Sequence, residues 1–204
     1  MRARVTFPIV DNRGRFIAFG GRVLDNSEPK YLNSPATPIF EKGKNLFALN
    51  IARSHIAKLG RAIVVEGYMD AISMHKAGFP ETVASLGTAF TVDQAFMLRK
   101  LGADVFLFFD GDSAGEKAAF SAIRICFQAG LVFKIVRQSV GKDPDDLARI
   151  GTDAVNSTLA EAKDPVDFAI NYPESQEDDP ASPQVRVRIA KQTLELLESS
   201  QDLL

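Results

Sequence analysis

The sequence predicts an α/β fold: a four-stranded parallel sheet flanked by helices, preceded by a small antiparallel β-hairpin region and followed by a helical C-terminal segment. The first observation behind this prediction is that four short, mainly apolar runs alternate with segments of helical periodicity. That alternation is typical of βαβ units around a buried parallel sheet. The second is that 204 residues, 46% of them hydrophobic and 25% charged, suffice to bury a core without disulfides.

The chain is predicted to begin with the hairpin. Alternating apolar residues indicate strands over Arg4–Val10 and Phe16–Val23, and the polar residues Asp11–Gly14 supply the turn between them. Gly20 and Gly21, in the second strand, indicate a bulge or a close approach of another group to the backbone.

A long connection and a helix complete the first predicted unit, residues 1–61. Residues 24–45 contain Pro, Asn and Ser without periodicity, and a connection of this length in a compact domain is often functional. From Leu46 the apolar residues follow a helical period, and Gly60 ends that helix.

The parallel sheet and its helices are predicted for residues 62–146. The four apolar runs are the expected strands, at Ala62–Val65, Thr82–Leu86, Val105–Phe109 and Val132–Val136. The segments between them are the expected helices, at Met69–Ala77, Thr91–Leu101 and Ala114–Ala129. Thr91 and Gln94 have the spacing of a capping box at the start of the second of these helices.

The remaining residues, 147–204, are predicted to be helical apart from one linker. The expected helices, of which the first begins just inside the sheet unit, are Pro144–Ile150, Asp153–Ala162, Pro165–Asn171 and Val185–Leu197. Residues 172–183 are acidic and proline-rich and lack periodicity, as linkers do. The last helix has an apolar face whose partner we expect outside this chain.

Composition and charge exclude several classes of protein. A single cysteine, Cys126, excludes an intrachain disulfide and a cysteine-rich zinc site, and no apolar run is long enough to span a bilayer. With no secretory signal at its start, the chain is predicted to be a cytoplasmic protein.

The net charge of −2 is unevenly distributed along the chain. Residues 1–61 carry 11 Lys/Arg against 4 Asp/Glu, and residues 62–204 carry 13 against 22. This asymmetry suits a protein that holds a polyanion on one surface and cations on another.

Acidic residues follow three of the four predicted strands, at the edge where open parallel sheets bind ligands. They are Glu66 and Asp70, Asp110 and Asp112, and Asp143, Asp145 and Asp146. So many carboxylates would raise one another's pKa unless a cation lay between them. Few basic residues lie near these loops, so the pattern favours a hard divalent cation such as Mg²⁺. The alternative is that single acids serve only as helix caps or first-turn charges, as Asp112 and Asp146 could.

The segment Glu66-Gly67-Tyr68-Met69-Asp70, followed by Asp110-Gly111-Asp112, resembles the signature of the Toprim domain of primases, topoisomerases and some nucleases. Over about residues 4–170, the sequence also resembles the DnaG-type bacterial primases. The segments that carry this resemblance are FGGRV at the end of the hairpin, Lys30 to Pro35, Phe40–Lys44, Ala84–Thr88 and Lys142–Asp145.

The resemblance implies DNA-templated synthesis of short RNA primers from nucleoside triphosphates, on a Toprim-type sheet. It implies that Mg²⁺ or Mn²⁺ is held by Glu66, Asp70, Asp110, Asp112, Asp143 and Asp145, with Glu66, Asp110 and Asp112 as the catalytic acids. It also implies that the nucleotide or the DNA template is contacted by Arg22, Lys30, Tyr31, Asn33 and Lys42. The implied partners are single-stranded DNA, NTPs and the RNA primer.

The sequence also departs from this family. Primases of this type carry a zinc-ribbon domain, a further N-terminal part of the polymerase domain and a helicase-binding domain, and none of these is expected here. We therefore expect a catalytic core fragment, weakly active or inactive alone, that would meet the replicative helicase through a domain it lacks. A Toprim nuclease, a mobile-element primase and a non-catalytic binding module remain alternatives.

Overall fold

The structure is a computed structural model that describes residues 1–87, 89–111, 113–137, 143–171 and 182–198. Its elements form two sheets. The first is antiparallel, in the order β1-β2-β3, with bounds Arg4–Val10, Phe16–Val23 and Tyr31–Asn33. The second is parallel, in the order β5-β4-β6-β7, with β4 at Arg61–Val65, β5 at Thr82–Ala84, β6 at Asp104–Phe108 and β7 at Phe133–Val136.

Helices alternate with the parallel strands and then follow them. Those up to the last strand are the 3₁₀ helix η1 at Lys42–Lys44, α1 at Leu49–Leu59, α2 at Tyr68–Lys76, α3 at Val92–Arg99 and α4 at Ser113–Ala129. The later ones are α5 at Pro144–Ile150, α6 at Thr152–Ala160, α7 at Pro165–Asn171 and α8 at Pro183–Glu198. The predicted α/β fold and the type of every predicted element within these residues are confirmed.

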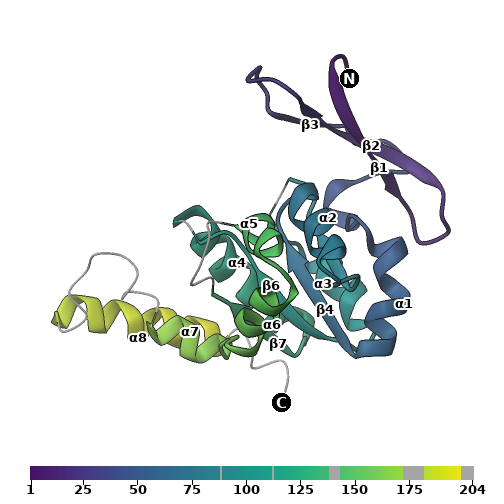
Figure 1. Ribbon diagram of the computed structural model, residues 1–204. Helices are drawn as coiled ribbons and strands as arrows, with labels where there is room; N and C mark the ends of the chain where they lie inside the picture. The colour runs from purple at the N-terminus through teal and green to yellow at the C-terminus, as the bar shows by residue number, and fades with distance from the viewer. Residues whose placement is uncertain (88, 112, 138–142, 172–181, 199–204) are drawn as a thin grey trace.

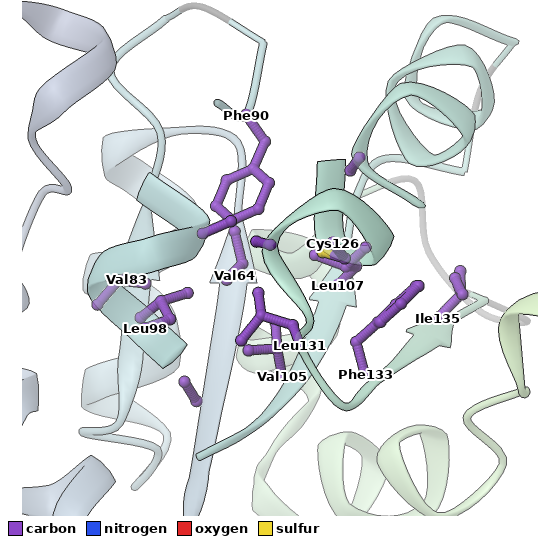
Figure 2. Close-up of a cluster of buried hydrophobic side chains, with 14 of the residues drawn as sticks. Val64, Val83, Phe90, Leu98, Val105, Leu107, Cys126, Leu131, Phe133 and Ile135 are labelled. Carbon is purple, nitrogen blue, oxygen red and sulfur yellow. The ribbon is translucent and has the colours of Figure 1, made fainter. Parts of the chain in front are cut away.

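The parallel sheet is covered by helices on both faces, which explains why its strands read as continuous apolar runs. Ala62 and Val64 of β4 belong to a core cluster with α1, α3, α4 and α7, whereas Ile63 and Val65 belong to a cluster with α2, α5 and α6. Figure 2 shows the first cluster, in which Val64 lies among side chains of the neighbouring strands and of α3 and α4. Cys126 of α4 is fully buried there, and burial raises the pKa of its thiol.

The antiparallel sheet projects from the body of the molecule on the side of α2 (Figure 1). Its inner face is joined to that body by a third apolar cluster that includes Phe7, Ile9 and Ala18 of the hairpin with Tyr68 of α2 and Leu86. This junction places the basic hairpin region beside the carboxyl ends of the parallel strands.

Two local predictions were wrong. Residues 24–45 were expected to form only a connection, but Tyr31–Asn33 pair with Gly20–Arg22 as strand β3. The helix expected from Leu46 begins at Leu49. The reason is that the backbone of Phe47 pairs with Ala84, through N–H···O distances of 2.9 and 3.2 Å, which keeps this part of the chain extended.

The last two helices, α7 and α8, lie at the end of the molecule opposite the antiparallel sheet (Figure 1). The last, α8, contacts α7 and α4, and Arg124 of α4 pairs with Glu195 at 2.9 Å, so the final helix does have a partner within this chain. The predicted linker at 172–183 lies almost wholly outside the described residues. Within them, no helix combines the length and apolar character that crossing a membrane requires.

Candidate active site

A cleft of about 600 Å³ lies between the carboxyl ends of β4 and β6, the start of α5 and the strands β2 and β3. It is lined by nine of the residues that the sequence singled out: Arg22, Lys30, Tyr31, Asn33, Glu66, Asp70, Asp110, Asp143 and Asp145. One wall of the cleft is therefore acidic and the other is basic and aromatic.

Glu66 and Asp110 form the first part of the acidic wall, because each follows the last residues of a central strand. The two loops are tied together: the backbone N–H of Asp110 donates to Oε1 of Glu66 at 3.3 Å. On the other side, the hydroxyl of Ser85 donates to the carbonyl of Glu66 at 3.2 Å. Neighbouring strand ends thus hold each other in register at the site.

A glycine at the start of α4 allows that helix to pack against the Asp110 loop. A Cβ atom on Gly115 would overlap the backbone carbonyl oxygen of Asp110, closer to it than real Cβ atoms ever come to another atom. Only a residue without a side chain fits, so the position of Asp110 depends directly on Gly115.

Asp70, Asp143 and Asp145 form the second part of the acidic wall. Asp70, in the first turn of α2, accepts the backbone N–H of Gly67 at 2.9 Å. Asp143 caps α5, because its Oδ1 accepts the backbone N–H of Asp146 at 2.7 Å. Asp143 both caps a helix and lines the cleft, so its role as a helix cap does not exclude a role in metal binding.

Asp145 has a basic partner that the sequence analysis missed. The Arg149 guanidinium donates to both of its carboxylate oxygens, from Nε at 3.1 Å and from Nη2 at 2.7 Å, and the Ser73 hydroxyl donates to Oδ1 as well. Burial alone would raise the pKa of Asp145, but these hydrogen bonds and the positive charge hold it below its usual value. The signal was present in the sequence as an i, i+4 spacing on α5.

Arg22, Lys30 and Tyr31 form the opposite, basic wall. The Arg22 guanidinium lies over the ring of Tyr31, with its central carbon 5.7 Å from the ring centroid. Lys30 is exposed, and Tyr31 is 37% exposed. Cations and an aromatic face at one site suit a ligand with phosphates and a planar base.

Asn33 and Tyr68 connect the two walls. The Tyr68 hydroxyl donates to Oδ1 of Asn33 at 2.6 Å, and Nδ2 of Asn33 donates to the carbonyl of Leu86 at 2.8 Å. The Tyr68 ring stacks on Phe7 at a centroid distance of 4.9 Å and lies so close to Gly20 that a Cβ there would be 2.6 Å from it. The expected close approach at Gly20 is therefore confirmed, and Asn33 fixes β3 against the body of the molecule.

Of the remaining predicted site residues, one lies elsewhere and one is not among the described residues. Lys42 is in η1, next to α3, where its carbonyl accepts Nε2 of Gln94 at 3.2 Å, and it does not line the cleft. Asp112 lies outside the residues that the structure describes.

The donor set of the acidic wall fits a hard divalent cation. Among the described residues, which omit Asp112, no three His, Cys, Asp or Glu side chains lie close enough together to enclose an ion. Mg²⁺, however, is usually bound by one or two carboxylates together with waters and substrate phosphates. Carboxylates that line an open cleft opposite basic side chains suit that mode of binding.

Asp70 is expected to destabilise the fold at neutral pH. Burial, followed by the charges of Asp143 and Asp145, raises its pKa from 3.8 to about 6, although the Gly67 N–H lowers it. Because the folded-state pKa is the higher one, stability should increase as the pH falls from 7 towards 4. Asp70→Asn should therefore increase the free energy of unfolding at pH 7.5 by about 1–3 kcal/mol, and by less at pH 5.

Urea unfolding at both pH values checks this expectation. Asp104→Asn, at the opposite end of β6 and exposed, is the matched control and should change little at either pH. The explanation would be contradicted if Asp70→Asn increased the free energy of unfolding equally at both pH values, or decreased it at pH 7.5.

Comparison with known proteins gives two family matches. A family described as Toprim-like matches residues 63–148, and a family described as the N-terminal domain of the DNA primase catalytic core matches residues 1–53. The DNA primase of Clostridium acetobutylicum is 46% identical to the chain over 172 residues, which are 83% of this chain and 28% of that protein.

Solved structures show the same relationship. A crystal structure of a DNA primase domain from Pseudomonas aeruginosa has a TM-score of 0.87 and 39% identity, and the match covers 98% of this chain and 64% of that one. A structure of the DnaG primase catalytic domain bound to single-stranded DNA has a TM-score of 0.82 and 39% identity, covering 97% of this chain and 64% of that one. The chain thus spans less than a third of the Clostridium relative and about two thirds of these structures.

Proposed function

The chain belongs to the DnaG-type bacterial DNA primases, and on that premise we propose that it carries the catalytic centre for DNA-templated synthesis of short RNA primers from NTPs. The observation that carries the proposal is the cleft with one acidic and one basic wall. Nucleotidyl transfer needs both walls, because the nucleotide and the growing strand are polyanions that must be brought together. The acidic wall would do this through the cations that it holds, and the basic wall by binding phosphates directly.

We assign Glu66, Asp110 and Asp112 as the catalytic acids, which with Asp70, Asp143 and Asp145 hold Mg²⁺ or Mn²⁺. When bound, such ions polarise the reacting phosphate and neutralise the charge of the leaving pyrophosphate. The hydrogen bond from the Asp110 N–H to Glu66 ties the loops of these two residues together at the sheet edge. Oxygen ligands on a rigid scaffold orient the substrate without reorganising during the reaction.

The basic wall is assigned to the phosphates and bases of the nucleotide and of the single-stranded template. Arg22 and Lys30 bind phosphates without reading sequence, and the Tyr31 ring provides a stacking face. Asn33 lines the same cleft and, through Tyr68 and Leu86, holds this wall at a fixed distance from the acids. Lys42 is assigned to nucleic acid that extends beyond the cleft.

The N-terminal match favours a primase over a Toprim nuclease, because residues 1–53 resemble the primase core specifically. The chain covers part of its relatives, so we propose that template initiation and contact with the replicative helicase need segments outside it. The proposed place of action is the cytoplasmic replication fork of a bacterium.

Ribonucleotide addition to an RNA primer annealed to a DNA template tests the proposal. With Mg²⁺ or Mn²⁺ the chain should add nucleotides slowly, Asp110→Asn should add none, and Asp104→Asn should behave as wild type. These two variants make the same chemical change at opposite ends of β6.

Shortening of the labelled strand would instead indicate a nuclease, and addition that persists in Asp110→Asn would contradict the assignment of the acids. Primers made without a preformed primer end, at the rate of a complete primase, would contradict the proposed need for further segments.

A further inference from the structure

Asp145, in the acidic wall, forms an ion pair with Arg149, which does not line the cleft. Both carboxylate oxygens of Asp145 accept hydrogen bonds from the guanidinium, at 3.1 Å from Nε and 2.7 Å from Nη2. Oδ1 also accepts the Ser73 hydroxyl. The same carboxylate lines the cleft beside Asp70 and Asp143.

A planar guanidinium and a metal ion compete for the same part of a carboxylate. The side-on, two-point pairing with arginine uses the lone pairs that lie in the carboxylate plane. A divalent cation bound by both oxygens approaches from that same side. Asp145 therefore cannot give both oxygens to a cation while it keeps both hydrogen bonds from Arg149.

The pair is built so that it can open. The Arg149 side chain is 66% exposed, whereas that of Asp145 is 15% exposed. An arginine this accessible to water gives up little free energy when it leaves its partner. The charges of Asp143 and Asp146 act on Arg149 as well, so Asp145 is not the only acid near the guanidinium.

We propose that Arg149 is a built-in counter-ion that occupies Asp145 until a divalent cation displaces it, which weakens cation binding at this wall. This inference rests on the proposed function, which places a cation there. Arg149 acts through Asp145, and it is therefore a residue that sets metal affinity and not a ligand. Its presence lets Asp70, Asp143 and Asp145 share one site without three uncompensated charges.

Titration of the chain with Mn²⁺ alone, with free Mn²⁺ followed by electron paramagnetic resonance, tests the inference. Arg149→Met should bind Mn²⁺ about three- to tenfold more tightly than wild type, because a competing charge and its hydrogen bonds are lost. Arg149→Lys should lie between the two, since lysine keeps the charge but not the two-point geometry.

Two controls separate this effect from a general change of charge. Arg53→Met removes an exposed arginine from α1 and should leave the affinity within about twofold of wild type. In an Asp145→Asn background, Arg149→Met should no longer tighten binding, as a double-mutant cycle requires of residues that act together.

The inference would be overturned if Arg149→Met bound Mn²⁺ as tightly as the wild type or more weakly. It would also be overturned if Arg149→Met still tightened Mn²⁺ binding in the Asp145→Asn background. Equal affinities of Arg149→Lys and wild type would also overturn it. These outcomes differ from a failure of the proposed function, in which the wild-type chain itself would leave all Mn²⁺ free.

Discussion

Glu66→Gln is expected to lower the affinity of the chain for Mn²⁺ by about ten- to a hundredfold and to abolish nucleotide addition. The substitution removes one negative charge and replaces a carboxylate oxygen by an amide nitrogen. The remaining amide oxygen can still accept the backbone N–H of Asp110, which lies 3.3 Å from Oε1 in the wild type. The fold should therefore persist while the site loses a ligand.

Calorimetric titration with Mn²⁺ measures this effect, with circular dichroism to compare the folds. Glu161→Gln, an exposed position at the end of α6, is the matched control and should bind as wild type does. An unchanged Mn²⁺ affinity in Glu66→Gln would exclude Glu66 as a ligand.

Gly115→Ala is expected to destabilise the protein by about 2–3 kcal/mol and to weaken Mn²⁺ binding at the same time. In most helices the same change is stabilising, because alanine has the higher helix propensity. Here the new methyl group would overlap the backbone carbonyl of Asp110, and the clash is with backbone that cannot rotate away. Either α4 or the Asp110 loop has to move.

Urea unfolding and Mn²⁺ titration of the same sample distinguish these effects. Ser121→Ala, an exposed position on α4, should be neutral or slightly stabilising and leave Mn²⁺ binding intact. A stabilised Gly115→Ala protein would show that α4 does not depend on a close approach at this glycine.

The parallel sheet could be predicted from the sequence because its central strands, β4 and β6, are buried on both faces and are apolar after their first residue. Ile63 and Val64 face opposite core clusters, and both must be apolar. β3 could not be predicted in this way, because three residues are too few to show a period and Tyr31 and Leu32 are both exposed. The position of Phe47 depends on pairing with Ala84, a contact between distant parts of the chain that no local pattern reveals.

The candidate site was predictable to the extent that strand ends define it. Glu66 and Asp110 follow directly from the rule that ligands bind at the carboxyl ends of parallel strands. What the sequence could not show is how side chains share their hydrogen bonds. Asp145 pairs with Arg149, and Asn33 is bonded at both ends to the body of the molecule.

The two walls of the cleft are expected to bind one nucleotide together, through a divalent cation. Calorimetric titration of ATP into the chain, with Mn²⁺ and then with a chelator, tests this expectation most directly. We predict that ATP binds only with Mn²⁺ and that Asp110→Asn, in the acidic wall, abolishes this binding. Lys30→Ala, in the basic wall, should bind ATP at least about tenfold more weakly, and Asp104→Asn should bind it as the wild type does. ATP binding that survives the chelator, or that neither Asp110→Asn nor Lys30→Ala affects, would contradict the expectation.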